Sequence, residues 1–374
     1  MRLSFLDSIR GIAALIVVTG HLHFTARPET WFFEIVGLRI FNQSVFAVSI
    51  FFVLSGLVLF LQVEGEKINY ISFIVRRAFR IFPACIFAVT VSYLIYLLWA
   101  PEPLISRGDW FNEVSWPPGI PLNSYLHHLL LDGADKLLRP IWSLVIEWRA
   151  SLVFPAIVML FAWSPRLTGG LAIATAIGVA MSPKSLITQG LLGIPGDYFY
   201  AAFFTTFFVA GIFIAAYRLN LVLFFRRTPF ARYVLLALCA YCLCIQATQD
   251  DRFGYIKLGL IGCALIVFCM SDSRARRLLR AGPLRYIGRI SYSLYLVHMI
   301  WIGILFRLLD GTNPLVISAA VIAASIVSAD LMNRFVETPA NRFGRRVAAL
   351  IKWPTFLPAA APPSALPSAD QRIE

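Results

Sequence analysis

Charged residues are scarce in this sequence. Asp, Glu, Lys and Arg together make up 14% of its 374 residues, whereas soluble domains carry about a quarter. Hydrophobic residues account for 59%, and apolar runs recur almost from one end to the other. This composition excludes the two soluble domains that the length alone would allow. It predicts an all-α fold in which a polytopic chain crosses a membrane many times.

Cysteine is also scarce, and its six residues form no disulfide framework. All six lie in apolar runs, where a free thiol behaves as a small hydrophobic side chain. The spacing Cys239-x-x-Cys242-x-Cys244 has no His or acid beside it, so we do not interpret it as a metal or redox motif. The sequence also lacks a Walker loop, a dinucleotide fingerprint, a G-x-S-x-G elbow and a zinc signature, which argues against the enzymes that depend on them.

No internal repeat is evident, which argues against a transporter built from inverted repeats. The net charge of +13 does not indicate a nucleic-acid partner, because the basic residues lie in short segments between apolar runs. The positive-inside rule accounts for that placement. The first apolar run has no small-residue cleavage site after it, so we interpret it as an uncleaved first span rather than a signal peptide.

The apolar runs predict a bundle of about ten transmembrane helices. The expected spans are residues 9–24, 40–63, 81–99, 141–163, 167–181, 199–217, 233–247, 255–270, 290–308 and 315–332. Basic segments follow the second, sixth, eighth and tenth spans, which places both termini in the cytoplasm. The transmembrane domain then covers residues 1–345, and residues 346–374 are expected to form a disordered Pro/Ala-rich cytoplasmic tail.

The first predicted span carries an arginine and a histidine on one face. Helical geometry places Arg10 and His21 about three turns apart, roughly 16 Å along the axis. Ionisable side chains are energetically costly within a membrane, so those that occur there more often have a functional role than none. The alternative is that Arg10 reaches the interface and His21 is a hydrogen-bonded packing residue.

A cluster of arginines opens the third predicted span. Arg77 and Arg80 are three residues apart, so they lie one above the other on a helix surface, and Arg76 is their neighbour. Arginine binds phosphate through two parallel hydrogen bonds, which suits a phosphate-bearing cosubstrate such as coenzyme A. The alternatives are a plain positive-inside cluster or a lipid-headgroup site.

Further polar residues lie within other predicted spans. Glu147 in the fourth span is expected at the depth of His21, where a carboxylate can orient an imidazole or raise its basicity. A structural polar contact is the alternative. His298 in the ninth span is a further histidine within the membrane, and Ser55-Gly56 in the second span predicts a small-residue notch for close helix packing.

Six motifs, taken in chain order, resemble the acyltransferase-3 family of integral membrane acyltransferases. They are Leu6-Asp-Ser-Ile-Arg10-Gly-Ile-Ala-Ala with His21, Phe51-Phe-Val-Leu-Ser-Gly56, Arg76-Arg-Ala-Phe-Arg80-Ile-Phe-Pro83, Trp142-Ser-Leu-Val-Ile-Glu147 with Phe154-Pro155, Gly288-Arg-Ile-Ser-Tyr-Ser-Leu-Tyr-Leu-Val-His298, and Phe335-Val-Glu-Thr-Pro339. Two positions depart from the family pattern. Ser49 stands where an acidic residue is common, and Ala150-Ser151 replaces the usual aromatic pair.

The resemblance implies transfer of an acyl group, usually acetyl from acetyl-CoA, to a hydroxyl group of a carbohydrate. It also implies that Arg10 and His21 are catalytic and that Arg77 and Arg80 serve the acyl donor. In the resulting hypothesis, His21 is oriented by Glu147 and takes the proton of a sugar hydroxyl as that hydroxyl attacks the thioester. A covalent acyl-histidine is equally compatible.

In this hypothesis the chain is a multi-pass protein of the inner or plasma membrane, and its expected partners follow from the reaction. They are acyl-CoA as cosubstrate, a carbohydrate or glycolipid acceptor and membrane lipid, with no nucleic acid, no bound cofactor and no metal. The alternative function is a transporter or flippase that moves a polar solute or a lipid-linked glycan.

Overall fold

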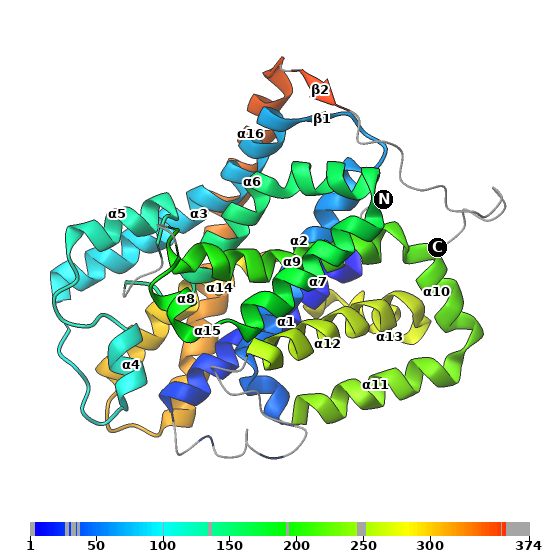
Figure 1. The fold of residues 1–374 in the computed structure, drawn as a ribbon. Helices are drawn as coiled ribbons and strands as arrows, with labels where there is room; N and C mark the ends of the chain where they lie inside the picture. The colour runs from blue at the N-terminus through cyan, green and yellow to red at the C-terminus, as the bar shows by residue number, and fades with distance from the viewer. Residues whose placement is uncertain are drawn as a thin grey trace.

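The computed structural model describes residues 4–26, 30, 35, 38–99, 101–133, 137–191, 194–244, 252–352 and 354–356. These residues are almost entirely helical, which confirms the predicted all-α class (Figure 1). They also include one antiparallel pairing of two short strands, β1 (Ile68–Asn69) with β2 (Thr355–Phe356).

Among the described residues, eight helices are long and apolar enough to cross a membrane. They are α1 (Ser4–Thr25), α2 (Ser44–Val63), α3 (Tyr70–Trp99), α6 (Ile141–Trp163), α9 (Gly196–Ala216), α12 (Arg252–Ser271), α14 (Gly282–Leu308), and α15 (Pro314–Met332) with its continuation. The shorter apolar helices α7 (Pro165–Met181) and α11 (Pro229–Cys244) coincide with the fifth and seventh predicted spans. The total of ten spans and the cytoplasmic location of both termini remain predictions.

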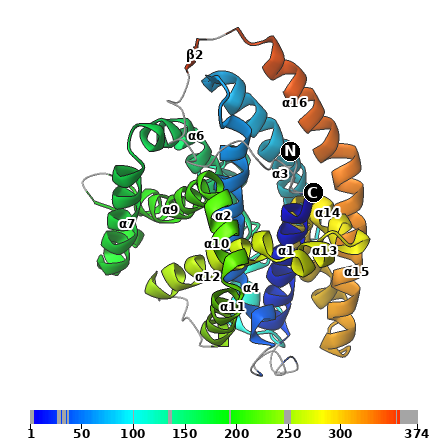
Figure 2. The ribbon, with the colours of Figure 1, turned by 90° about the vertical axis from the view of Figure 1, so that its right-hand side faces the viewer.

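The last long helix continues beyond the predicted tenth span. α15 passes through a π-helical turn, Asn333–Glu337, into α16 (Thr338–Leu350). α16 packs against the beginning of α3, at the end of the molecule that also holds β1 and β2 (Figures 1 and 2). The boundary expected at residue 345 lies inside α16, and Thr355 and Phe356 of the expected tail form β2, which pairs with β1. Residues 357–374 of the expected tail lie outside the described residues.

Short helices lie in the links between the long ones. They are α4 (Asp109–Val114), α5 (Leu122–Leu130), α8 (Lys184–Thr188), α10 (Arg218–Arg227) and α13 (Ser273–Leu279), with a 3₁₀ turn at Arg39–Asn42. The link between the third and fourth predicted spans thus contains two helices, α4 and α5. Basic segments before the third and ninth predicted spans are also helical, since arginine is a good helix former. This confirms that Arg77 and Arg80 lie one turn apart on a helix.

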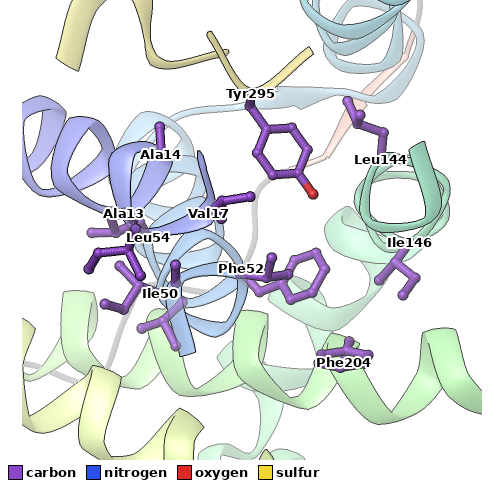
Figure 3. Packing of buried hydrophobic residues seen from close by; sticks show 14 of the residues in the cluster. Ala13, Ala14, Val17, Ile50, Phe52, Leu54, Leu144, Ile146, Phe204 and Tyr295 are labelled. Atoms are coloured by element: carbon purple, nitrogen blue, oxygen red, sulfur yellow. The ribbon is translucent and has the colours of Figure 1, made fainter. Parts of the chain in front are cut away.

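Helix α2 lies in the centre of the bundle and packs against α1, α9 and α12. Figure 3 shows Ile50, Phe52 and Leu54 among the buried side chains of this core. A Cβ atom on Gly56 would overlap the backbone of Phe208 in α9, so only glycine permits this approach. The predicted role of Ser55-Gly56 in close helix packing is confirmed.

Helices α1 and α14 cross in direct backbone contact. A Cβ atom on Gly11 would overlap the backbone of Gly288, and one on Gly288 would overlap the backbone of Asp7. Further along the pair, His21 contacts His298, and each histidine is ten residues beyond its glycine. Equal steps on both helices mean that α1 and α14 run side by side in the same direction. This parallel packing places the two histidines together, about 15 Å from the glycine crossing.

Candidate active site

A cavity of about 840 Å³ lies between α1, α2, α3, α6, α14 and α16. Most of its titratable lining is basic, which is unusual in an otherwise apolar bundle. The arginines that line it are Arg10, Arg76, Arg77, Arg80, Arg289, Arg342 and Arg345, and the acids are Asp7, Glu147 and Glu337. Every site residue predicted from the sequence is therefore in this cavity, with the exception of His21. Such a concentration of arginines favours an anionic ligand.

The carboxylate of Glu147 pairs with Arg77 in the cavity wall. Arg77 Nη2 donates to Glu147 Oε1 over 2.5 Å, and Arg77 Nε donates to Ser151 Oγ over 3.1 Å. The expectation that Glu147 orients His21 is therefore wrong. The rotation of α6 relative to α3 directs the Glu147 carboxylate towards the Arg77 guanidinium. A sequence does not specify that rotation. Ser151, one of the positions that depart from the family pattern, supplies a second acceptor to the same guanidinium.

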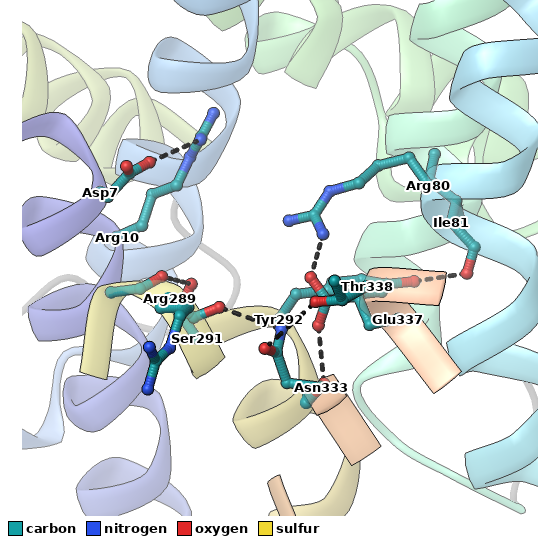
Figure 4. A network of polar contacts seen from close by, with 12 residues as sticks. Asp7, Arg10, Arg80, Ile81, Arg289, Ser291, Tyr292, Asn333, Glu337 and Thr338 are labelled. Atoms are coloured by element: carbon teal, nitrogen blue, oxygen red, sulfur yellow. Dashed lines mark hydrogen bonds and ion pairs between the residues drawn. The ribbon is translucent and has the colours of Figure 1, made fainter. Parts of the chain in front are cut away.

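The carboxylate of Glu337 holds Arg80 in the same way. Arg80 Nη1 donates to Glu337 Oε1, Ser293 Oγ donates to Glu337 Oε2 over 2.7 Å, and the guanidinium lies over the ring of Tyr292 (Figure 4). Glu337 is only 4% exposed and closes the π-helical turn. Turns of this kind frequently occur at functional sites. The sequence indicated Glu337 only as part of a motif and assigned it no contact.

The third acid of the cavity lies beside Arg10. Arg10 Nη1 is 3.8 Å from Asp7 Oδ1, one helical turn earlier on α1 (Figure 4). Each acid in the lining thus has one arginine as its partner. The seven arginines exceed the three acids by four positive charges, so the cavity retains a strong preference for anions.

His21 lies beyond the cavity and is paired with His298. His21 Nδ1 is 2.9 Å from His298 Nε2, and the rings are stacked with centroids 5.1 Å apart. His298 Nδ1 is 3.2 Å from the carbonyl oxygen of Leu294, to which it can only donate. In the neutral pair, His298 Nε2 is then the acceptor and His21 Nδ1 the donor. This tautomer leaves the unprotonated Nε2 of His21 free to accept a proton.

Tyr295 separates the cavity from the histidine pair. It lines the cavity, and its ring centroid is 6.0 Å from that of His298. Its hydroxyl is 2.7 Å from Ser143 Oγ and donates to the carbonyl oxygen of Pro140 over 3.2 Å. Sequence reasoning missed Tyr295, although the spacing of Tyr295 and His298, three residues apart on one helix, was a usable signal.

Comparison with known proteins identifies the same family that the sequence motifs resemble. Residues 3–334 match a family model described as an acyltransferase domain, the acyltransferase-3 family. The chain is 26% identical to peptidoglycan O-acetyltransferase OatA of Listeria monocytogenes and 27% identical to putative peptidoglycan O-acetyltransferase YrhL of Bacillus subtilis. Both alignments cover 91% of this chain, but only 56% and 55% of the relatives, so the chain spans about half their length.

A third relative has nearly the length of this chain. Acyltransferase MdmB of Streptomyces mycarofaciens is 26% identical over 92% of this chain and 94% of its own. No solved structure has significant similarity to the chain. The family match, the apolar helices and the basic cavity agree with one another. The chain belongs to the acyltransferase-3 family, whose model describes an acyltransferase domain, and its helices are those of a multi-pass membrane protein.

Proposed function

We propose that this enzyme transfers an acyl group, in the first instance acetyl, from acyl-CoA to a hydroxyl group of a cell-surface or secreted carbohydrate. The observation that carries this proposal is the basic cavity beside the stacked pair His21–His298. Such a site suits a donor with phosphate groups at one end and a thioester at the other. Two relatives are named peptidoglycan O-acetyltransferases, which supports a carbohydrate acceptor.

Coenzyme A would enter from the cytoplasm as a cosubstrate and occupy the cavity. The volume of about 840 Å³ is within the ordinary range of small-molecule sites. Arg76, Arg77 and Arg80 remain our proposed donor-binding residues, and Arg10 lies in the same cavity. Glu147 then serves the donor by holding Arg77, and Asp7 does the same for Arg10. Neither Glu147 nor Arg10 needs to take part in proton transfer.

His21 is the proposed general base. Its Nε2 accepts the proton of the acceptor hydroxyl while the hydroxyl oxygen attacks the thioester carbonyl carbon. The carbon–sulfur bond breaks, and the proton passes to the departing thiolate of coenzyme A. A positioned base contributes about 10²–10⁴-fold to such a step. A covalent acyl-histidine intermediate would form on the same nitrogen and remains the alternative.

His298 is a positioning residue in this mechanism. Its hydrogen bond fixes the ring and the tautomer of His21, the role that the sequence assigned to Glu147. The thioester must pass Tyr295 to reach His21, because Tyr295 stands between the cavity and the histidine pair. The reaction would take place in the inner or plasma membrane.

The test uses the full-length protein in lipid vesicles with acetyl-labelled acetyl-CoA and a peptidoglycan fragment. We expect label on the glycan, and a rate about 10²–10⁴-fold lower for His21→Ala. His127→Ala is the matched control, since His127 is a partly exposed histidine of α5 that does not line the cavity. A transporter or flippase would leave the glycan unlabelled, and a His21→Ala rate close to that of the wild type would end the assignment of His21 as base.

A further inference from the structure

Three arginines in the cavity lining form no ion pair with any acid that the structure describes. Arg77, Arg80 and Arg10 each pair with an acid of the wall, and Arg289 lies 3.9 Å from Asp330. Within the described part of the chain, no ion pair joins an acid to any of the other three. These are Arg76, Arg342 and Arg345, and all are exposed. The charges still available to a ligand are therefore at the open rim of the cavity.

Helix α16 presents one polar stripe to this rim. Its lining residues are Thr338, Asn341, Arg342 and Arg345, which follow the spacing i, i+3, i+4 and i+7. Residues at this spacing share one face of an α-helix. The face that borders the cavity therefore carries two arginines one turn apart, with an amide and a hydroxyl above them.

Helix α16 is fixed against α3, so its arginines have defined positions. Ser72 Oγ donates to the carbonyl oxygen of Ala348 over 2.8 Å, and the rings of Phe79 and Phe343 meet edge to face. β1 precedes α3 and β2 follows α16, so the pairing of these strands also joins the two helices at that end. Arg76 belongs to the same stretch of α3. The three rim arginines thus form a preorganised group on two packed helices.

We propose that Arg342 and Arg345, together with Arg76, bind the ribose 3′-phosphate of the coenzyme A donor. The inference rests on the proposed function, which directs the thioester to the Tyr295 end of the cavity and leaves the nucleotide at the rim. The 3′-phosphate is the outermost anion of the donor in that orientation. A dianionic phosphate matches a group of guanidinium ions without acid partners. α16 begins at Thr338, four residues after the last residue of the family match.

The decisive variant is Arg342→Ala/Arg345→Ala, assayed with acetyl-CoA and with acetyl-3′-dephospho-CoA. With acetyl-CoA we expect the KM to rise about 10-fold and the kcat to change little, because two partly exposed charge-assisted contacts are lost. With the dephospho donor, the wild type and the variant should have the same KM. Arg346→Ala is the matched control, because Arg346 is an exposed arginine of α16 outside the cavity lining.

Direct binding of adenosine 3′,5′-bisphosphate to the full-length protein gives a second readout that does not depend on transfer. The wild type and Arg346→Ala should bind it equally well, the double alanine variant should bind it about 10-fold more weakly, and Arg342→Lys/Arg345→Lys should recover part of the affinity. An unchanged KM, or an equal rise with both donors, would overturn the assignment while leaving the acyl transfer intact. A wild type that binds no bisphosphate and transfers no label would overturn the proposed function together with it.

Discussion

His298 Nε2 accepts a hydrogen bond from His21 Nδ1 across the parallel helices α14 and α1, over 2.9 Å. His298 is fully buried and is itself tied to the carbonyl oxygen of Leu294. The backbone of α14 therefore fixes the tautomer of His298, and His298 in turn fixes the tautomer of His21 on α1. The orientation of His21 depends on a second histidine rather than on a carboxylate.

Replacement of His298 by phenylalanine keeps the stacked ring but removes the acceptor. We expect His298→Phe to lower kcat about tenfold, the equivalent of one hydrogen bond, with no change in the KM for acetyl-CoA. His298→Gln should restore part of the rate, since its amide oxygen can occupy the place of Nε2. Steady-state kinetics of both variants provide the check. A raised KM with an unchanged kcat would show that His298 serves the donor instead.

Glu147→Gln distinguishes the two roles that have been considered for this acid. If Glu147 holds Arg77, then Glu147→Gln should have a higher KM for acetyl-CoA and a lower melting temperature than the wild type, because Arg77 loses its charged partner. The loss of stability should be about 1–3 kcal/mol. A fall in kcat alone would instead favour the original assignment to His21.

The coupling of Glu147 with Arg77 can be measured directly. Arg77→Met and Glu147→Gln should be strongly non-additive in thermal unfolding, since their side chains form one ion pair. Additive losses would mean that the pair contributes little, as is common for exposed ion pairs.

The arginines of α3 show what the sequence can and cannot specify. Arg77 and Arg80 were correctly placed one turn apart on a helix, and Arg10 and His21 on one face of the first span, because helix periodicity is a local property. Their partners depend on how separate helices rotate against one another. Glu147 therefore received the wrong partner.

Glu337 was missed for a different reason. The apolar run of the tenth span ends near residue 332, and hydropathy therefore does not predict that the helix continues through a π-helical turn. That turn directs Glu337 back into the bundle, where it meets Arg80 and Ser293. Arg342 and Arg345 were likewise not assigned to the site, although the arginines of α16 are visible in the sequence.

Arg80→Ala alone is a poor test of donor binding. Glu337 is buried, so loss of Arg80 leaves an unpaired charge in the protein, which costs about 3–5 kcal/mol. We expect Arg80→Ala to reduce both stability and activity, and Arg80→Met/Glu337→Gln to recover stability. The KM for acetyl-CoA of the stable double variant then reports on donor binding. If the double variant melts no higher than Arg80→Ala, the ion pair is not the cause of the instability.

Tyr295 offers a test of the route from the cavity to His21. Tyr295→Phe and Ser143→Ala both remove the hydrogen bond between these two side chains, and Tyr295→Phe also removes the one to the carbonyl oxygen of Pro140. Tyr295→Ala removes the ring that separates the cavity from the histidine pair, and water can then reach the thioester near the base. We expect it to hydrolyse acetyl-CoA without an acceptor, measured as release of free thiol. Hydrolysis no faster than in the wild type would indicate that the thioester does not pass this residue.

The glycine crossing of α1 and α14 should control catalysis from a distance. A Cβ atom on Gly288 would overlap the backbone of Asp7, whereas one on Gly282, in the same helix, would meet no atom within 4 Å. Gly288→Ala should therefore destabilise the protein by about 1–3 kcal/mol, the usual cost of overpacking. The separated helices would also displace His298 from His21, and a misplacement of about 1 Å can cost on the order of 100-fold in rate. We expect a large fall in kcat for Gly288→Ala and none for Gly282→Ala. A Gly288→Ala enzyme that melts lower but keeps its kcat would mean that the histidine pair is held by contacts near His21 itself and not by the crossing of the helices.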